Sequence, residues 1–471
     1  MMRNRILYQF FCAIGLLSVS ASCSNFLEVE EKGRTTIPAF FSDPEGLRAG
    51  LVGTYNALYD YYDSQFMEYP DVAGNMASLQ ILASGSDMVE QYNYTSDQAS
   101  EVGAVGYIWR KIYIAQTNAN NVIRYAPQVE TNYPASAESC RNILGQALLI
   151  RALCHFDQCR VYAQPYNYTA DASHLGVPVL RVTPGPDDNV SRNTVKEVYQ
   201  QVLDDLTQAS SLLADAQAAD FRYASLQAVN AMFSRVYLYM EDWANALKYA
   251  KLAIGSQPLA DSTAYINMYK NLSTQGEAIF RLSGEDMSGQ LKKFYESNCL
   301  PADTLISLYA PNDIRLKLLM QNGARKCTKY YATAVPGNQD KRDDPFVFRL
   351  SEVYLNAAEA ACHVGSYAEA RVYVNAILDR AVGSADAQAV LDACQDQDLL
   401  ALVQKERVKE LCFEGHNLFD ITRWKQNLVR EKKTNSTMKR LNYPSDLFVL
   451  PIPEAELNAN TNMQPNPTVN K

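Results

Sequence analysis

The sequence offers few residues for covalent or metal chemistry. Its four histidines, His155, His174, His363 and His416, are not spaced as metal ligands, and neither an H-E-x-x-H nor a C-x-x-C motif occurs. Cys154 precedes His155 directly, but neighbours on a helix point apart, which disfavours a nucleophile pair. P-loop, G-x-G-x-x-G and G-x-S-x-G motifs are absent. We therefore expect no catalytic residues, no metal ligands and no cofactor.

Two chemical alternatives stay open. Glycoside hydrolysis needs only two carboxyl groups that are close in space, and the chain has 52 acidic residues. A structural Ca²⁺ in the loops also stays open. Neither alternative has a sequence motif in its favour, so we expect a binding protein rather than an enzyme.

Tyrosine is the residue type that points to binding, because the chain has 30 Tyr and only 3 Trp. Aromatic rings match the C–H face of a sugar, and the phenol adds a hydrogen bond. Two loop-rich stretches, about 63–104 and 255–345, collect tyrosines together with polar residues. The alternative is that these tyrosines pack the loops onto the scaffold, and the tryptophans Trp109, Trp243 and Trp424 are expected in the core. The predicted ligand contacts are Tyr61, Tyr62, Tyr69, Asp87, Tyr92, Asn93, Tyr94, Tyr265, Tyr269 and Tyr295, with Tyr92 and Tyr94 as the leading pair.

The first residues predict export. Arg3 and Arg5 precede an apolar stretch of about 14 residues, which is too short for a membrane span of about 20. Small residues then lead to Cys23, as a lipoprotein signal requires. We expect residues 1–22 to be a signal peptide and Cys23 to be lipidated, the alternative being an ordinary signal with a coincidental cysteine.

The net charge of the chain disfavours some classes of binding partner. The chain has 43 basic and 52 acidic residues and a net charge of −9, which disfavours nucleic acid or an anionic lipid surface. Export would permit disulfides, yet eight cysteines remain after Cys12 and Cys23 are set aside, too many for the sequence to choose a pairing. Cys299 and Cys327, in the loop-rich stretch, are the weak candidates for a disulfide.

Helical periodicity dominates the chain. Asp43-Pro44-Glu45 predicts a capped helix start, because Asp can cap and Pro suits the first turn. A helix over 105–125 should end before Pro127, and Ser191 or Asn193 should lie near the start of another. The predicted helices are about 43–62, 105–125, 137–162, 194–213, 226–240, 243–254, 348–363, 367–380 and 399–413.

An internal repeat links residues 238–246 with 361–370. In both copies a helix ends, an aromatic residue (Trp243 or Tyr367) opens the next helix, and an alanine recurs three residues later. This is the helix-turn-helix pattern of tetratricopeptide repeats.

Four segments resemble the SusD/RagB family of outer-membrane nutrient-binding lipoproteins. Residues 23–29, C-S-N-F-L-E-V, resemble the mature N-terminus of family members. Residues 348–360, F-R-L-S-E-V-Y-L-N-A-A-E-A, resemble the family's arginine-led helix. The most diagnostic segment resembles E-R-V-K-E-L-C-F-E-G-H-N-L-F-D-I-T-R-W at 406–424, with Asn417 where the family often has Arg. The C-terminal end resembles L-P-I-P-E-A-E-L at 450–457 and Q-P-N-P at 464–467. Glu406, Arg407, Glu410 and Glu414 are neighbours on one helix, which suits ion pairs, and Gly415 suits a positive φ, so we interpret this segment as a fold determinant.

The resemblance implies a mostly α-helical, tetratricopeptide-like scaffold with loop and short-strand insertions that form a ligand face. It implies one domain over 23–471, with an N-terminal part to about 255 and a C-terminal part from about 256. It further implies an outer-membrane, lipid-anchored, surface-facing protein that binds a glycan and delivers it to a SusC-like TonB-dependent transporter, which contacts the helical repeats. A peptide ligand is the alternative, since some relatives bind peptides, and a surface glycoside hydrolase is the less favoured one.

Overall fold

The structure is a computed structural model that describes residues 36–83, 87–97, 103–185, 187–213, 220–284, 289–330 and 343–467. Within these residues most of the secondary structure is helical, and the strands are short. The predicted signal peptide and Cys23 lie outside the described residues, so both stay predictions.

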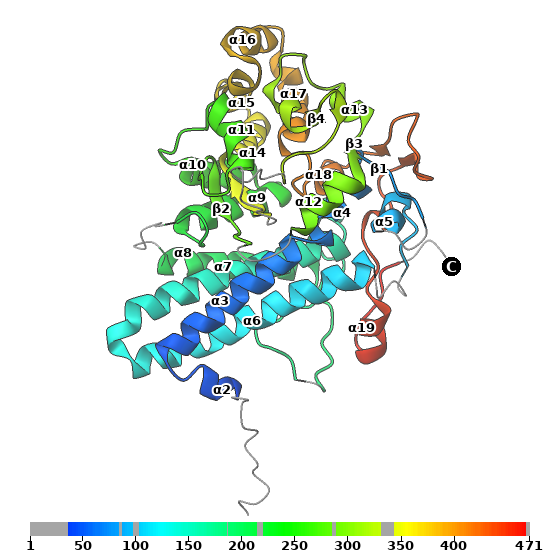
Figure 1. Cartoon of the computed structure of the whole chain (residues 1–471). Helices are drawn as coiled ribbons and strands as arrows, with labels where there is room; N and C mark the ends of the chain where they lie inside the picture. Colours follow the sequence, from blue (N-terminus) through cyan, green and yellow to red (C-terminus); the bar gives the residue numbers. More distant parts are fainter. Residues whose placement is uncertain are drawn as a thin grey trace, which may run out of the picture.

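The helices and strands follow one another along the chain (Figure 1). The longer helices are α3 (Pro44–Tyr62), α6 (Ala104–Asn132), α7 (Ala137–Tyr162), α8 (Val195–Leu212), α9 (Leu226–Tyr239), α10 (Trp243–Ile254), α14 (Leu350–His363), α15 (Tyr367–Val382) and α17 (Asp396–Leu411). Shorter helices are α2 (Ile37–Phe40), α4 (Gln65–Ala73), α5 (Val89–Asn93), α11 (Ser262–Lys270), α12 (Gln290–Ser297), α13 (Asp303–Ile306), α16 (Ser384–Asp392), α18 (Asn417–Arg423) and α19 (Glu454–Ala459). The strands are β1 (Ala77–Leu79), β2 (Ala278–Arg281), β3 (Cys299–Pro301), β4 (Met320–Gln321), β5 (Ala324–Arg325), β6 (Phe346–Arg349), β7 (Leu428–Val429) and β8 (Arg440–Leu441).

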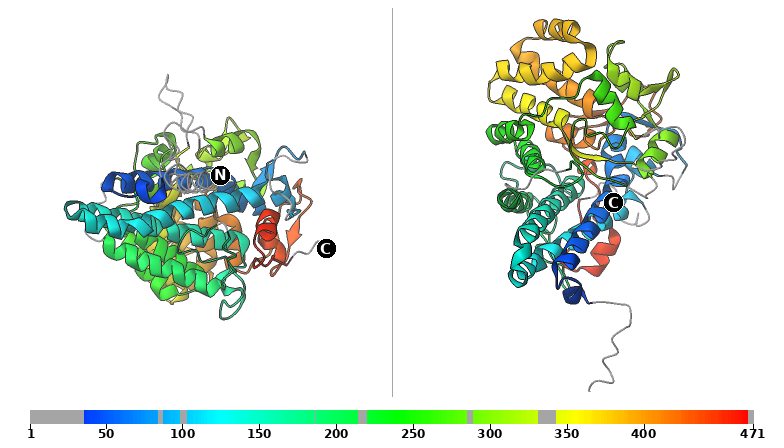
Figure 2. Two further views of the ribbon diagram at one scale, coloured as in Figure 1. Left: turned by 90° about the horizontal axis from the view of Figure 1, so that it is seen from below. Right: turned by 60° about the vertical axis from the view of Figure 1, so that its left-hand side comes forward.

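The long helices form a continuous stack of neighbours. Helix α6 packs between α3 and α7, α7 packs on α8, and the pairs α9–α10 and α14–α15 continue the stack toward α16 (Figures 1 and 2). This arrangement confirms the predicted helical scaffold of tetratricopeptide-like pairs.

The repeat predicted from sequence forms two equivalent helix pairs. Each turn places one residue at positive φ, Glu241 at 60° and Gly365 at 78°, as a tight helix end requires. The ring of Trp243, which opens α10, stacks on His363, which ends α14, with ring centroids 3.7 Å apart. The two repeats therefore pack directly against one another.

Local signals explain the helix starts. The Asp43 side chain accepts a hydrogen bond from the Gly46 N–H at 2.8 Å, as predicted for α3. Helix α8 instead uses Thr194, which forms a capping box with Glu197, and not Ser191 or Asn193.

Several predicted helix boundaries were wrong, among them those of α6, α14 and α17, the last of which spans Asp396–Leu411 instead of 399–413. Helix α6 continues through Pro127 to Asn132, because Ala126 and Val129 are buried in the core and their packing outweighs the lost backbone hydrogen bond. Helix α14 begins at Leu350 because the preceding residues, Phe346–Arg349, pair with β2 as strand β6.

The short strands form two-stranded ladders within the described residues. Strand β1 pairs antiparallel with β3, in a register that places Ala77 opposite Pro301 and Leu79 opposite Cys299. This ladder ties the first predicted insertion to the second.

The first insertion is mainly core. Every α4 residue after Gln65 is buried, although the sequence predicted a loop. The candidate disulfide is also absent, because Cys299 and Cys327 are both free and buried.

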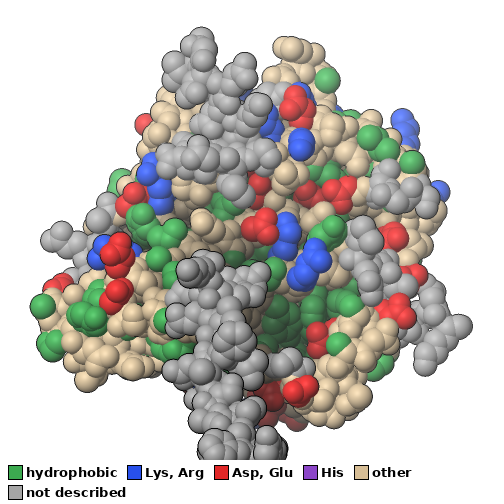
Figure 3. All heavy atoms as spheres, turned by 60° about the horizontal axis from the view of Figure 1, so that its bottom comes forward, with side chains coloured by type: hydrophobic (Ala, Val, Ile, Leu, Met, Phe, Trp, Pro, Cys, Tyr) green, Lys and Arg blue, Asp and Glu red, His purple; other side chains and the backbone are tan. Residues whose placement is uncertain are grey.

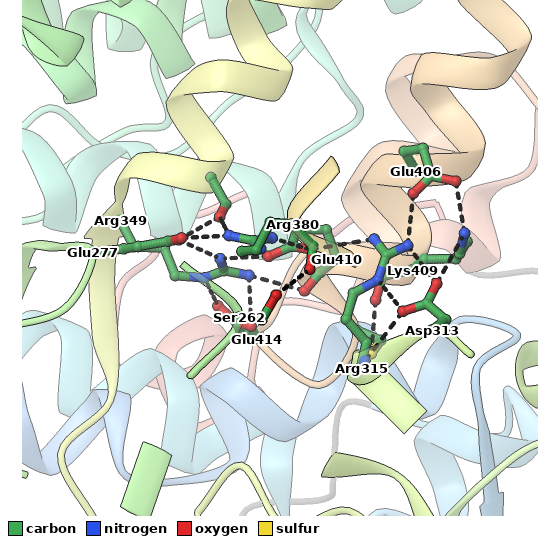
Figure 4. A network of polar contacts seen from close by, with 12 residues as sticks. Ser262, Glu277, Asp313, Arg315, Arg349, Arg380, Glu406, Lys409, Glu410 and Glu414 are labelled. Atoms are coloured by element: carbon green, nitrogen blue, oxygen red, sulfur yellow. Dashed lines mark hydrogen bonds and ion pairs between the residues drawn. The ribbon is translucent and has the colours of Figure 1, made fainter. Parts of the chain in front are cut away.

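A buried ion network holds the C-terminal half together (Figure 4). Glu410 contacts Arg315, Arg349 and Arg380, which come from three other elements. Opposite charges thus balance without solvent, as buried ions require. The network joins five basic and five acidic side chains: Arg315, Lys329, Arg349, Arg380, Lys409, Glu277, Asp313, Glu406, Glu410 and Glu414.

This network confirms the signature segment as a fold determinant but corrects its partners. Most partners of Glu406, Glu410 and Glu414 come from distant segments rather than from neighbours on the helix. Gly415 has φ 75°, as predicted.

Candidate functional site

A pocket of about 530 Å³ lies where the two insertions meet the scaffold. Residues of α4, α6, α12 and the segment after β1 line it, so it collects parts of the chain more than 200 residues apart. We call it the insertion pocket. Its lining residues are Ser64, Gln65, Glu68, Ile81, Asp87, Tyr107, Lys111, Gln290, Lys293, Phe294, Ser297 and Asn298.

Glu68 is the most unusual group of the insertion pocket. The residue is 2% exposed, and its Oε2 has no hydrogen-bond partner. Burial raises the pKa of this carboxyl well above its usual range, and nearby Asp87 raises the pKa further. The raised pKa favours the protonated form of Glu68, which carries a hydroxyl donor beside an acceptor oxygen.

Charged groups of both signs surround Glu68. Burial raises the pKa of Asp87, whose carboxylate accepts a hydrogen bond from Gln65. Lys111 is held near Asp60, with its Nζ 3.3 Å from Oδ1. Lys293 of α12 is exposed and brings a second cation to the pocket. The insertion pocket can thus donate and accept hydrogen bonds at several points.

Tyr107 supplies the aromatic surface of the pocket, whereas Phe294 in its wall is only 6% exposed. Tyr107 is half-buried, and the guanidinium of Arg110 lies 4.8 Å from its ring centre. Ile81, which is 48% exposed, adds apolar area. Sequence reasoning missed Tyr107, because it lies on a helix assigned wholly to the scaffold; its place on the α6 face turned toward the insertions was the available signal.

A buried carboxyl pair anchors α12 against the pocket. Asp63 accepts hydrogen bonds from the N–H groups of Gln290 and Leu291 at 3.1 Å, and Asp343 accepts one from Lys292 at 2.7 Å. The two carboxyls are hydrogen-bonded to each other, and burial raises the pKa of Asp63 to about 6 and that of Asp343 to about 8. The pair thus holds one proton at neutral pH and fixes the helix that carries Lys293 and Phe294.

The predicted tyrosines occupy the core instead of a ligand face. Tyr61 and Tyr62 both donate to Asp157 Oδ2 at 3.1 Å, and Tyr295 donates to Asp71 at 2.9 Å. A ring covered by protein has no free face for a sugar, so the stacking role predicted for these tyrosines is corrected to loop packing. The correction applies to Tyr61, Tyr62, Tyr69, Tyr92, Tyr94, Tyr265, Tyr269 and Tyr295, all of which are buried.

The leading pair, Tyr92 and Tyr94, shows how the protein covers these rings. The guanidinium of Arg430 lies 4.3 Å from the ring centre of Tyr92, whose hydroxyl donates to Asn435 at 2.7 Å. Tyr94 donates to the backbone oxygen of Ala73 at 2.6 Å. Both rings therefore hold α5 to the body of the protein.

The two polar candidates have different positions. Asp87 is exposed and lines the insertion pocket. The side-chain oxygen of Asn93 accepts a hydrogen bond from the Thr437 N–H at 2.9 Å, which gives it a role in fixing that loop. A ligand contact by either residue stays a prediction.

A second hollow of about 510 Å³ lies between α6 and α19. There Trp109 donates through its indole N–H to Glu456 Oε2 at 3.3 Å. Trp109 is 5% exposed, in agreement with its predicted core position.

The part of the chain that the structure describes contains neither a group of metal ligands nor a helix able to cross a membrane. No three His, Cys, Asp or Glu side chains there are grouped as metal ligands. No helix there combines the length and the apolarity that crossing a bilayer demands.

The lower face of the molecule carries apolar and charged side chains together (Figure 3). Among the exposed apolar residues are Ile37 and Phe40 of α2, Val52 of α3 and Ile114 of α6.

Comparisons with known proteins agree with this architecture. A family model described as "SusD family" matches residues 256–468, and one described as "Starch-binding associating with outer membrane" matches residues 25–238. Two SusD-like proteins of Formosa agariphila are 22% and 23% identical, the alignments covering 97% and 96% of this chain and 97% and 98% of the relatives.

Solved structures show the same fold. A SusD superfamily protein from Bacteroides thetaiotaomicron has a TM-score of 0.81 at 24% identity, over 90% of this chain and 100% of that chain. A putative sugar binding protein from Bacteroides vulgatus has a TM-score of 0.79 at 25% identity, over 90% and 98%.

Proposed function

This chain belongs to the SusD family, and we propose that it binds an oligosaccharide or polysaccharide nutrient in the insertion pocket. The single observation that carries the proposal is the composition of that pocket. It joins the aromatic ring of Tyr107 to the polar groups of Glu68, Asp87 and Lys293. A sugar ring needs both an apolar contact and several hydrogen bonds, which is the pattern of a small-molecule site.

The size of the pocket supports an oligomeric ligand. About 530 Å³ falls within the usual range for ligand pockets, roughly 300–1,000 Å³. The pocket lies at the surface, since Ile81, Asp87 and Lys293 are exposed, so a long chain can lie across it with only part of its length enclosed.

Delivery to a SusC-like TonB-dependent transporter is the second part of the proposal. The family description that names association with the outer membrane supports a site of action there. With a lipid at Cys23, only 12 residues would separate the anchor from Thr36, a reach of at most about 47 Å over 13 residue steps. The face with α2 would then lie near the membrane and its transporter.

The proposal is for binding without turnover. The less favoured alternative, a glycoside hydrolase, draws on one observation: Glu68 and Asp87 line the same pocket, and the pKa of Glu68 is raised, as that of a general acid is. Release of reducing ends from any polysaccharide, abolished by Glu68→Gln, would establish that alternative.

The test is a binding screen of the protein starting after Cys23. Native affinity gels with diverse polysaccharides should show retardation by one glycan class, and Lys293→Ala should weaken it. Lys270→Ala, an exposed lysine at the end of α11, is the control and should leave the retardation unchanged.

Heat released by mixed peptides, with no retardation by any glycan, would replace the glycan with a peptide ligand. Equal retardation of the Lys293→Ala variant and the unsubstituted protein would remove the insertion pocket from the account.

A further inference from the structure

A hollow of about 340 Å³ lies at the other end of the β1–β3 ladder. Asn75 and Met76 precede β1 and line this hollow, whereas Ile81 follows β1 and lines the insertion pocket. Ile81 is five residue steps from Met76, which is roughly 17 Å along an extended chain. We call the hollow the Trp424 pocket. Helices α13, α17 and α18 and strand β7 supply the other lining residues.

Trp424 presents its ring but not its N–H group. The indole N–H donates to the buried carboxylate of Glu359 at 2.7 Å, which fixes the orientation of the ring. The side chain is only half-buried and lines the pocket. The uncovered part of the ring is therefore an apolar surface held in one position, which is what stacking on a sugar requires.

Asn417 brings a fixed polar group to the same hollow. The residue is 2% exposed, and its Oδ1 accepts a hydrogen bond from the Asn75 N–H at 2.9 Å. That bond sets the orientation of the side-chain amide. Its Nδ2 has no hydrogen-bond acceptor among the described residues and is not completely buried. A buried side chain thus offers an unused donor at the wall of the pocket.

The remaining polar groups of the hollow are mostly amides. Gln404 and Gln426 both line it, with the Gln426 Nε2 3.4 Å from the Gln404 Oε1. Lys405 adds one cation, and no Asp or Glu is among the lining residues. Amides both donate and accept, as sugar hydroxyls do, and a lysine without a carboxylate tolerates an anionic sugar.

A peptide fits this hollow less well. Extended peptides gain affinity by pairing with an open strand edge. At β7 one edge pairs with β8, and the Asn75 Nδ2 lies 3.4 Å from the backbone oxygen of Val429.

We propose that the Trp424 pocket is a second carbohydrate-binding site, which takes one or two neutral or anionic sugar units by contact with Trp424 and the surrounding amides. The inference rests on the proposed glycan-binding function but concerns a separate site. A long glycan bound by both pockets, or two glycans bound at once, would raise retention at the cell surface.

The three tryptophans make this site directly observable. Trp109, Trp243 and Trp424 are the only ones in the chain, so an indole ¹⁵N–H spectrum has three signals, assignable by single Trp→Phe replacements. The probes are maltose, cellobiose, xylobiose, mannobiose and digalacturonate at millimolar concentration. At least one should shift the Trp424 signal saturably and leave the Trp243 signal in place.

Two variants test whether the probe binds in the Trp424 pocket. Ala401→Phe fills the pocket from an exposed position on α17 and should raise the Kd read from the Trp424 signal at least about tenfold. Ala385→Phe makes the same change at an exposed position of α16 and should leave the Kd unchanged. A Trp424 signal that no probe moves, or one that moves equally in Ala401→Phe, overturns the inference.

The two proposals fail separately. Polysaccharide retention that depends on Lys293, with an unmoved Trp424 signal, leaves the insertion pocket in place and removes the second site. A shift of the Trp424 signal, together with polysaccharide retention that does not change in Lys293→Ala, supports the second site and removes the insertion pocket.

Discussion

Arg349 binds Glu414 with two hydrogen bonds in the interior, Nε to Oε2 at 2.6 Å and Nη2 to Oε1 at 2.9 Å. Arg349 ends strand β6, and Glu414 follows α17, so the pair joins the two most diagnostic sequence segments. The neighbouring guanidiniums and Lys329 overcome the penalty of burial, and the pKa values of Glu410 and Glu414 lie below their usual range.

Removing Arg349 should be strongly destabilising. Arg349→Met leaves Glu410 and Glu414 buried with one cation fewer, and breaking a buried ion pair in this way costs about 3–5 kcal/mol. The measurement is urea unfolding followed by circular dichroism.

The control for that variant is Arg141→Met. Arg141 pairs with Glu130 at the surface, and such pairs contribute at most about 1 kcal/mol. Equal losses in the two variants would show that the buried network has no special weight in stability.

Alkaline pH should destabilise the protein through the Asp63–Asp343 pair. The pKa of Asp343 is raised to about 8 in the folded state, whereas an unfolded aspartate titrates near 3.9. Between these values the folded state binds more protons, so stability falls as pH rises toward 8.

Asp343→Asn should remove that pH dependence, because the amide donates to Asp63 permanently. We expect the variant to gain melting temperature relative to the unsubstituted protein at pH 8.5 but not at pH 5. A difference that is the same at both pH values would contradict the shared proton.

Acid pH should destabilise the protein through the buried histidine His155. Burial and nearby Arg151 lower the pKa of His155 to about 3, and the ring accepts a hydrogen bond from the Leu180 N–H at 3.1 Å. The unfolded histidine takes up a proton near pH 6.5, so its contribution to stability is lost as pH falls from about 6.5 toward 3.

His155→Gln should therefore flatten the decline in melting temperature between pH 6.5 and 4. His174→Gln is the comparison, because that histidine is only partly buried. A slope unaffected by His155→Gln would assign the acid sensitivity to other groups.

The tyrosines of α5 should affect stability and not affinity. Tyr92→Phe and Tyr94→Phe each remove a buried hydroxyl that donates to a protein oxygen, at a cost of about 1 kcal/mol or more. Calorimetry with the glycan found in the screen should give an unchanged Kd. A weakened Kd without a stability loss would restore these residues to the ligand site.

The scaffold followed from sequence because its signals are local. The Asp43 cap, the positive φ at Gly415 and the repeated turns at Glu241 and Gly365 each depend on a few consecutive residues. These features sufficed to predict the helix pairs.

The candidate site could not be predicted from the sequence, because its geometry depends on contacts between residues far apart in the chain. Tyr92 is buried by Arg430, which is 338 residues away, and no local pattern encodes that contact. Tyr107 lies on the side of α6 that lines the pocket, whereas the opposite side of this helix is buried in the core. Loop composition indicated the region of the proposed pocket, with Asp87 in it, but not the ring of Tyr107, which remains partly uncovered.

The measurement that tests the central claim most directly is the affinity of a variant with a filled insertion pocket. Ser297→Trp places a large ring in that pocket, from a serine whose hydroxyl donates to the backbone oxygen four residues earlier. Ser211→Trp makes the same change at an exposed serine of α8 with the same type of hydrogen bond. With the glycan from the screen, we predict that Ser297→Trp weakens binding at least about tenfold while Ser211→Trp leaves it unchanged. Equal affinities for both variants would contradict glycan binding in the insertion pocket.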